Sequence, residues 1–172
     1  MSTLSVDTIQ GQTTASKVKM PEGCVVQEVH HPCTTYFILN TTSYTDLTGA
    51  SITFTPKFAN SKLLVQSVQH FYLEQTGTAW TGANSRVVID GNGQAASSSS
   101  GSSVYGVGSR DTNQSGSQTT RLMAYDDQTA TYTVSSTNSI IIKAQVKLIQ
   151  SVSTCNVNNY GRGYLKVTEI AQ

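Results

Sequence analysis

Residues 140–148 read IIIKAQVKL, the clearest indication of secondary structure in this chain. Every second side chain is apolar, and the positions between are mostly polar. The apolar positions are Ile140, Ile142, Ala144, Val146 and Leu148, and the polar ones are Lys143, Gln145 and Lys147. Successive side chains of a β-strand point to opposite faces. This period of two residues therefore predicts a strand with one face in a core and the other in solvent.

The same two-residue period occurs elsewhere along the chain. Shorter examples are residues 51–55, 86–90, 131–134 and 164–168. Residues 62–73 are instead apolar on both faces, which predicts a central strand that is covered on both sides. No window shows the 3.6-residue period of an amphipathic helix over three turns. The sequence therefore predicts strands and no helix.

Turn-forming residues separate these stretches. They stand at Thr48 and Gly49, at Pro56, at residues 90–93 (DGNG), at Asp126 and Asp127, and at residues 160–163 (YGRG). Many short strands separated by turns are typical of a β-sandwich. We therefore predict an all-β fold, an antiparallel β-sandwich of the jelly-roll type, over residues 24–172.

Two regions fall outside this pattern. Residues 1–23 carry sparse apolar side chains and cannot form a core alone, so we predict an extended arm that anchors the chain to a neighbour. About 20 residues at about 3.3 Å each would reach roughly 65 Å. The apolar anchoring positions are Leu4, Val6, Ile9, Val18 and Met20. Residues 94–120 are rich in Ser, Gly and Gln and predict a long loop, and we expect partners to order both regions.

The composition is that of a weakly charged protein with a neutral polar surface. Only 12% of the residues are charged and the net charge is +1. Such a chain has no long-range field to steer it to nucleic acid or anionic lipid. No stretch approaches the roughly 20 apolar residues of a membrane span. We therefore expect neither nucleic-acid binding nor membrane insertion.

Catalytic signatures are few. His30, His31 and His70 are the only histidines, and no Gly-x-Ser-x-Gly motif occurs. With so many serines, a Ser or Cys near a His would arise by chance. We therefore predict that the protein is not an enzyme. A hydrolase would have to show turnover that is lost when one histidine is changed.

Cys24, His30, His31 and Cys33 lie within ten residues of one another and are the ligand types that zinc prefers. Their spacing matches no zinc pattern, and adjacent histidines in a strand point to opposite faces. We therefore predict no metal site and no cofactor, although one histidine per chain near a threefold axis would form a three-His ring. Residues 90–93 lack the later glutamate of a calcium loop and predict a hairpin turn instead.

The cysteines of the chain predict where it is made. Their number is three, which is odd, and the sequence starts without a signal peptide, so a secreted disulfide scaffold is not expected. This pattern predicts synthesis in a reducing cytoplasm.

Two aromatic residues are candidates for recognition. Trp80 lies in the stretch TGTAWTGAN and Tyr105 in VYGVG, both among small polar residues that are typical of loops. Aromatic side chains on loops can stack on sugars or anchor a protein partner, and they can equally cap a sandwich or fill a subunit interface. We favour the interface or cap.

Several segments resemble virion structural and fibre-like proteins of phages, particularly phages of marine bacteria and cyanobacteria. They are residues 2–10 (STLSVDTIQ), 17–23 (KVKMPEG), 50–56 (ASITFTP), 60–65 (NSKLLV) and 165–171 (LKVTEIA), which together span nearly the whole chain. The resemblance implies a jelly roll related in shape to the trimeric C1q and tumour-necrosis-factor folds, a homotrimer, and a protein without enzymatic activity.

This resemblance leads to a functional expectation with two versions. The first is a capsid decoration or cement protein in the virion, made in the host cytoplasm, whose arm lies across the major capsid protein. The second is a short tail fibre or spike that docks into tail components and contacts the host. The short chain, without a repetitive shaft or heptads, favours decoration. A carbohydrate-binding module, with Trp80 and Tyr105 on a host surface glycan, is the alternative from another class.

Overall fold

The computed structural model describes residues 21–76, 82–94, 102–105, 119–148, 154–159 and 162–172. These residues form eleven strands and no helix. The strands are β1 (Val25–Cys33), β2 (Phe37–Ile38), β3 (Thr45–Phe54), β4 (Lys62–Thr76), β5 (Gly82–Ile89), β6 (Asn92–Gln94), β7 (Ser102–Tyr105), β8 (Thr119–Thr133), β9 (Ile140–Leu148), β10 (Thr154–Val157) and β11 (Gly163–Ile170).

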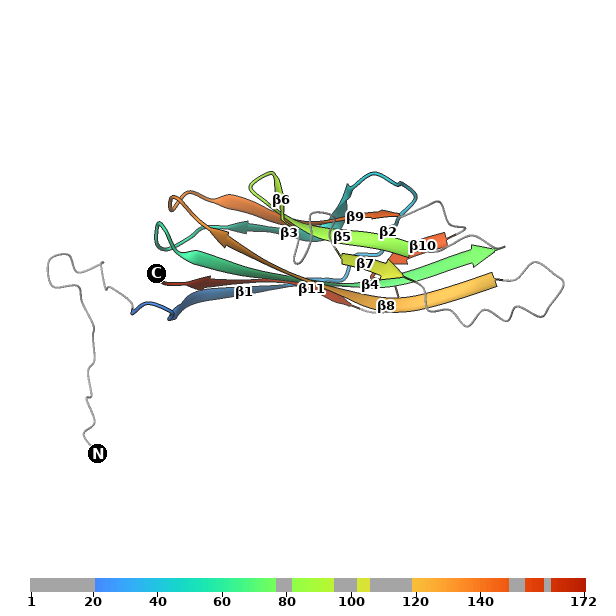
Figure 1. The fold of residues 1–172 in the computed structure, drawn as a ribbon, viewed down its shortest axis with the longest axis horizontal. Coiled ribbons are helices and arrows are strands. Elements are labelled where there is room, and N and C mark those ends of the chain that lie inside the picture. The colour runs from blue at the N-terminus through green and yellow to red at the C-terminus, as the bar shows by residue number, and fades with distance from the viewer. Residues whose placement is uncertain (1–20, 77–81, 95–101, 106–118, 149–153, 160–161) are drawn as a thin grey trace, which may run out of the picture.

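The strands assemble into two antiparallel sheets that stack face to face (Figure 1). Sheet A has the order β1-β11-β4-β10-β2, with β8 paired to β4 as well. Sheet B has the order β3-β9-β5-β6, with β7 also paired to β5. The pairing is nested along the chain, because β1 pairs β11, β3 pairs β9, β4 pairs β8 and β5 pairs β7. Nested pairs divided between two sheets make a jelly roll, so the predicted all-β antiparallel sandwich is confirmed.

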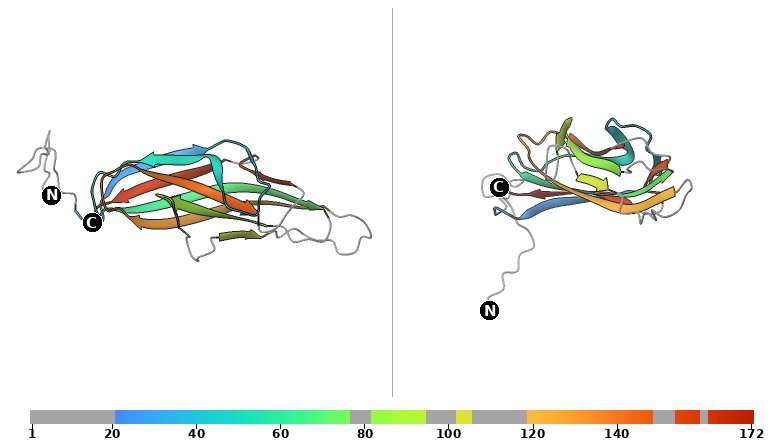
Figure 2. Two further views of the ribbon diagram at one scale, coloured as in Figure 1. Left: turned by 90° about the horizontal axis from the view of Figure 1, so that it is seen from above. Right: turned by 45° about the vertical axis from the view of Figure 1, so that its right-hand side comes forward.

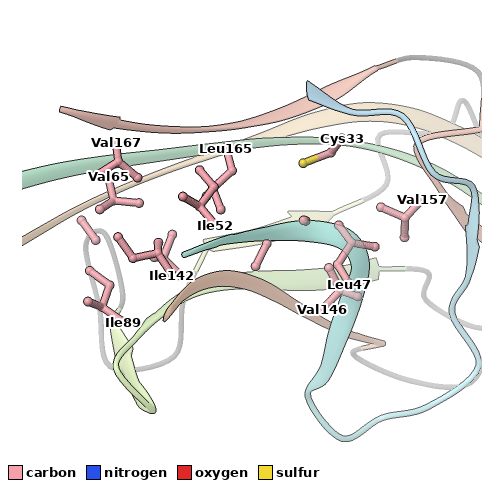
Figure 3. Close-up of a cluster of buried hydrophobic side chains, with 14 of the residues drawn as sticks. Cys33, Leu47, Ile52, Val65, Ile89, Ile142, Val146, Val157, Leu165 and Val167 are labelled. Carbon is pink, nitrogen blue, oxygen red and sulfur yellow. The ribbon is translucent and has the colours of Figure 1, made fainter. Parts of the chain in front are cut away.

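The core lies between the two sheets, and Figure 3 shows the inner faces meeting there. Sheet B contributes Ile142 and Val146 from β9, and both are fully buried. Sheet A contributes Val65 from β4 and Leu165 and Val167 from β11, which are also fully buried. The alternation predicted over residues 140–148 and 164–168 is therefore confirmed, because the apolar side chains at every second position from Ile142 and from Leu165 are buried.

Strand β4 departs from the prediction that it is covered on both sides. Leu63 and Val65 are fully buried, whereas Leu64 between them is 38% exposed. One face of β4 packs on sheet B, and none of the described strands forms a second layer over the other face. The prediction is wrong for this chain alone, because a sandwich of two sheets covers each sheet on one side only.

Two predicted turns lie inside strands. Gly49 falls within β3, where the register to β9 shifts between Asp46 and Ser51. Its φ of 78° is left-handed, and a Cβ there would lie 2.5 Å from Thr35 Oγ1, so glycine makes a β-bulge here rather than a turn.

Asp126 and Asp127 lie in the middle of β8 rather than in a turn. Asp126 points inward and is buried, where it accepts hydrogen bonds from the Ser85 hydroxyl and, at 3.0 Å, from Gln128 Nε2. Pairing with the whole length of β4 overrides the local turn preference of two adjacent aspartates.

The hairpin predicted at residues 90–93 is confirmed. Asp90 and Gly91 form a two-residue turn between β5 and β6, with φ of 50° and 80°. Positive φ at both central residues is the geometry of a type I′ turn, which Asp-Gly favours.

The loop predicted over residues 94–120 is not continuous. Strand β7 lies within it and pairs with β5, with Tyr105 opposite Gly82. Strand β6 pairs with residues 87–89 of β5, and β7 pairs with residues 82–85 of β5. Strand β7 thus satisfies backbone hydrogen-bonding groups of β5 that a central strand cannot leave unpaired. The prediction of one long loop is therefore wrong for residues 102–105.

The junction between the predicted arm and the domain is held by backbone hydrogen bonds. Gly23 N donates to Ala171 O, and Ala171 N donates to Cys24 O, both at 2.9 Å. The described chain therefore starts beside the C-terminus, at one end of the sandwich (Figure 2). Most of the arm, residues 1–20, lies outside the described residues.

A buried carboxylate ties the connection between β3 and β4 to sheet A near this end. Glu169 on β11 is fully buried and accepts hydrogen bonds from the segment between β3 and β4 and from β1. The donors are Lys57 N at 3.0 Å, Phe58 N at 3.1 Å, Ser61 Oγ at 2.7 Å and Gln27 Nε2 at 2.6 Å. Burial acts to raise the pKa of Glu169, but these hydrogen bonds outweigh it and hold the pKa below its usual value.

Candidate interaction face

The outer face of sheet A carries an apolar, tyrosine-rich surface. Its residues are recognised from the register, because side chains alternate between the two faces of each strand. On β4 the core residues Phe71 and Leu73 point inward, so Tyr72 points outward. Tyr72 is paired with Asn156 on β10 and with Met123 on β8. Asn156 is in turn paired with Ile38 on β2, so one row of outward positions crosses four strands.

The side chains at the ends of this row are exposed. Ile38 and Met123 are each 59% exposed, and Tyr125, two residues further along β8, is 62% exposed. Tyr36 lies on the same side, because its hydroxyl donates to Asn156 Oδ1 at 3.0 Å. We call Tyr36, Ile38, Tyr72, Met123 and Tyr125 the tyrosine face.

His70 points to the same side of β4 as Tyr72, opposite Tyr125 on β8, and is covered there. It is 5% exposed, and its ring packs edge-on against Tyr125 with 5.0 Å between the ring centroids. Its Nδ1 is buried and has no hydrogen-bond partner in the described part of the chain, and burial lowers the pKa of His70. The neutral imidazole is therefore the form that fits here.

Charged groups near the tyrosine face are engaged in an ion pair or in hydrogen bonds within the chain. Lys166 on β11 forms an ion pair with Glu28 on β1 at 2.9 Å. The two carboxylate oxygens of Asp127 accept hydrogen bonds from Gln66 Nε2 at 3.2 and 3.1 Å. The Tyr72 hydroxyl donates to Glu74 at 2.6 Å. The outer face of sheet A can therefore be covered without leaving any of these groups unpaired.

The outer face of sheet B has a different chemistry. Ile141 is exposed on this face, at 54%, and it is the one exposed large apolar side chain among the described residues of β9. Its neighbours on the outward positions of the same strand are Lys143, Gln145 and Lys147. The exposed apolar side chains of the described strands therefore gather on sheet A, and this asymmetry identifies the candidate interaction face.

The structure separates the histidine and cysteine candidates for a metal site. His30 points outward and stacks on Tyr164, with ring centroids 5.1 Å apart, whereas His31 Nε2 donates to the Gly49 carbonyl at 3.0 Å. The two rings lie on opposite sides of β1, as the sequence predicted. Within the described ranges, no group of three or more His, Cys, Asp or Glu side chains could hold a metal ion.

The three cysteines are free thiols. Cys33 and Cys155 are buried, and burial raises the pKa of the Cys33 thiol and raises that of Cys155 to about 12. At neutral pH both are therefore protonated and unreactive, because the thiolate is the nucleophile. They act as small apolar side chains in the core.

The residues that the sequence singled out for recognition and anchoring lie elsewhere. Trp80 and the arm positions Leu4, Val6, Ile9, Val18 and Met20 lie outside the described residues. Tyr105 belongs to strand β7 rather than to a loop. The predicted roles of these residues stay predictions.

Sequence reasoning missed the tyrosine face. A signal was present, because Met123 and Tyr125 alternate with inward positions of β8, and Ile38 and Tyr36 follow the same period. The sequence alone does not show that these two segments meet on one sheet, since β2 and β8 are joined only through β10 and β4.

Comparisons with known proteins add little to this description. No protein-family model matches the sequence, and no curated protein matches it. Among solved structures, the chain is similar to one from "Israeli acute paralysis virus heated to 63 degree - full particle", with 13% identity and a TM-score of 0.21, over 98% of this chain and 83% of that one. Similarity at this TM-score carries no argument about fold or function. In the described part of the chain, no helix has the length and apolar character to span a membrane.

Proposed function

We propose that this chain is a structural protein of a bacteriophage virion that forms a homotrimer through the tyrosine face and has no enzymatic activity. The observation that carries the proposal is the exposure of Ile38, Met123 and Tyr125, each more than half exposed in the single chain. An apolar surface of this kind on a water-soluble domain marks a site of interaction.

Further copies of the same chain fit this surface. Three sandwiches around a threefold axis would cover their apolar faces in one symmetric step. The ion pair of Glu28 and Lys166 means that copies can approach each other without a strong charge on either side. A trimer would also cover β4 a second time, which accounts for the apolar pattern on both faces of residues 62–73.

The position of the chain ends supports attachment at one end of the sandwich. Gly23 is hydrogen-bonded to Ala171, so the arm leaves the domain beside the C-terminus. In the proposal, apolar side chains anchor the arm to neighbouring virion proteins, and the sandwich stands away from those proteins. The anchoring residues are Leu4, Val6, Ile9, Val18 and Met20. The resemblance to phage virion proteins and the placement of the arm at one end of the sandwich support a capsid decoration or cement protein on the major capsid protein. A short tail fibre or spike is the alternative.

The trimer is tested with two matched substitutions. Ile38→Asp places a charge in the tyrosine face, and Ile141→Asp places the same charge on the outer face of sheet B at a nearly equal exposure, 59% against 54%. We expect the native protein and Ile141→Asp to have about three times the 18.4 kDa mass of one chain in multi-angle light scattering. We expect Ile38→Asp to be monomeric, because a buried unpaired charge opposes assembly.

A monomeric native protein, or equal effects of the two substitutions, would contradict assembly through this face. If the native protein were monomeric and bound glycans on an array, with binding lost in Trp80→Ala or Tyr105→Ala, the carbohydrate-binding module would replace the trimer as the proposed function.

The anchoring arm is tested by deleting residues 1–20. We expect the truncated chain to remain a folded trimer, since none of the described core contacts involves these residues. We expect its attachment to particles that lack the protein to fall at least tenfold in a sedimentation assay. Undiminished attachment would show that the domain itself binds the particle.

A further inference from the structure

The outer face of sheet B carries a cluster of polar and charged side chains opposite the tyrosine face. Ile142 and Val146 are buried in the core, so alternation places residues 143, 145 and 147 of β9 on this outer face. Arg86 and Asn84 of β5 are paired with Gln145 and Lys147. The cluster consists of Tyr44, Asp46, Asn84, Arg86, Gln145 and Lys147, and we call it the Arg86 cluster.

The guanidinium group of Arg86 is held in one orientation. Its Nε donates to Gln145 Oε1 at 2.8 Å, and its Cζ lies 4.1 Å from the centre of the Tyr44 ring. Gly93 of β6 leaves room for it, because a Cβ at that position would lie 3.0 Å from a terminal nitrogen of Arg86. The hydrogen bond at Nε and the contact between the guanidinium plane and the Tyr44 ring fix this arginine. Its terminal nitrogens are therefore presented as a preorganised fork.

The Arg86 cluster has positive charge that the described chain leaves unpaired. Asp46 is engaged by Lys143 at 2.6 Å and by Gln145 Nε2 at 2.7 Å, and these hydrogen bonds hold the pKa of Asp46 below its usual value. Lys147 Nζ lies 4.7 Å from the centre of the Tyr44 ring. Among the described residues, no carboxylate forms an ion pair with Arg86 or Lys147, and the carboxylate of the cluster, Asp46, is engaged by Lys143 and Gln145.

The cluster also contains an acceptor without a donor. Asn84 is 7% exposed and its side chain hydrogen-bonds to Tyr44, but its Oδ1 has no hydrogen-bond partner among the described residues. A buried acceptor in this state is costly unless a donor reaches it. A ligand that suits the cluster therefore combines an anion for Arg86 and Lys147 with a hydrogen-bond donor.

We propose that the Arg86 cluster binds the carboxylate of an acidic sugar. A uronic acid supplies the planar carboxylate that pairs with a guanidinium fork, and its hydroxyl groups supply donors for an amide oxygen. A glutamate or aspartate side chain supplies the carboxylate alone, so an acidic protein surface fits less well. Binding at the Arg86 cluster is independent of the tyrosine face, because the two sites lie on opposite faces of the sandwich. The full-length protein is therefore suitable for the test in any oligomeric state.

The probes are methyl β-D-glucuronide and methyl β-D-glucoside, which differ in the carboxylate at C6. Binding to the full chain is measured by saturation-transfer difference NMR, which detects weak ligands. We expect the glucuronide to bind and the glucoside to bind at least tenfold more weakly. Arg86→Gln should weaken glucuronide binding about tenfold or more, and Arg86→Lys should weaken it less, because lysine keeps the charge and loses the fork.

Lys57→Gln is the matched control, since it removes one positive charge from an exposed side chain outside the cluster. We expect it to bind the glucuronide as the native protein does. If Arg86→Gln does not fold, Lys147→Gln carries the same test. Equal binding of the two sugars, equal losses in the control and cluster variants, or displacement by sulfate as effective as by glucuronide would each overturn the proposal.

Discussion

The two outer faces of the sandwich differ although the strands behind them fill the same core. Sheet A presents Ile38, Met123 and Tyr125 to solvent, and sheet B presents Arg86 and Lys147. The inner positions of both sheets are constrained by packing, since each must be apolar and of fitting volume. The outer positions have no such constraint, so their chemistry is available for function. One face therefore suits copies of the chain and the other a charged ligand.

The largest effect on stability is expected for two neighbouring residues of β9, one on its inner face and one on its outer face. Ile142 is fully buried, whereas its neighbour Ile141 is 54% exposed. Ile142→Asp should lower the free energy of unfolding by more than about 4 kcal/mol, enough to abolish folding of a marginally stable domain. Ile141→Asp should change it by less than about 0.5 kcal/mol. Denaturant unfolding measures both, and a soluble Ile142→Asp variant with a native melting curve would show that the inner face of β9 was assigned wrongly.

A smaller effect is expected where Glu169 holds the connection between β3 and β4 on sheet A. Glu169→Gln keeps the size of the side chain but removes the negative charge that accepts hydrogen bonds from four donors. We therefore expect the free energy of unfolding to fall by about 2–3 kcal/mol. The pKa of Glu169 is lowered in the folded state, so its contribution is present above the ordinary pKa of glutamate and is lost as the pH falls through the lowered value. Chemical unfolding at several pH values should therefore show a shallower acid loss in Glu169→Gln. An equally steep loss would assign the acid sensitivity to other carboxylates.

The smallest effect concerns His70 beside the tyrosine face. Its pKa is lowered by burial, so the unfolded chain binds the proton more tightly, and stability falls as the pH drops below the ordinary pKa of histidine. We expect the native protein to lose stability between about pH 7 and pH 5, a window above the ordinary range of carboxylates. This loss of stability with pH should be smaller than the loss that the Glu169→Gln substitution causes. It should disappear in His70→Gln when the melting temperature is measured against pH. His30→Gln, on an exposed ring, is the control, and a flattened profile in this control would move the effect away from His70.

The inner face of the fold was largely predictable from the sequence. The alternation of Ile142, Ala144 and Val146 identified the core side of β9 without any knowledge of its neighbours. The Asp-Gly hairpin at residues 90 and 91 was predictable for a similar reason, because two consecutive residues with positive φ are a local requirement.

Local turn signals misled where long-range pairing was stronger. Asp126 and Asp127 favour a turn by themselves, yet they lie in β8 because every residue of that strand pairs with β4. Gly49 marked a bulge rather than a turn, since β3 continues its pairing with β9 on both sides of it. Neither outcome can be read from neighbouring residues in the chain.

The candidate sites were the least predictable feature. Ile38 and Met123 stand far apart in the sequence and are joined in one row only through β10 and β4. Arg86, Gln145 and Asp46 likewise come from three strands of sheet B. Composition showed a weakly charged chain, but it did not show that unpaired cations gather on one face.

From its sequence alone, this protein could be recognised as an antiparallel β-sandwich without helices, and the inward side of its clearest strands could be assigned. Those properties follow from the two-residue period of a strand, which is a local property of the chain. Tertiary structure alone decided which strands became neighbours, which outer face stayed apolar, and which charges found no partner. These depend on contacts between residues far apart in the sequence, and such contacts exist only once the two sheets have formed.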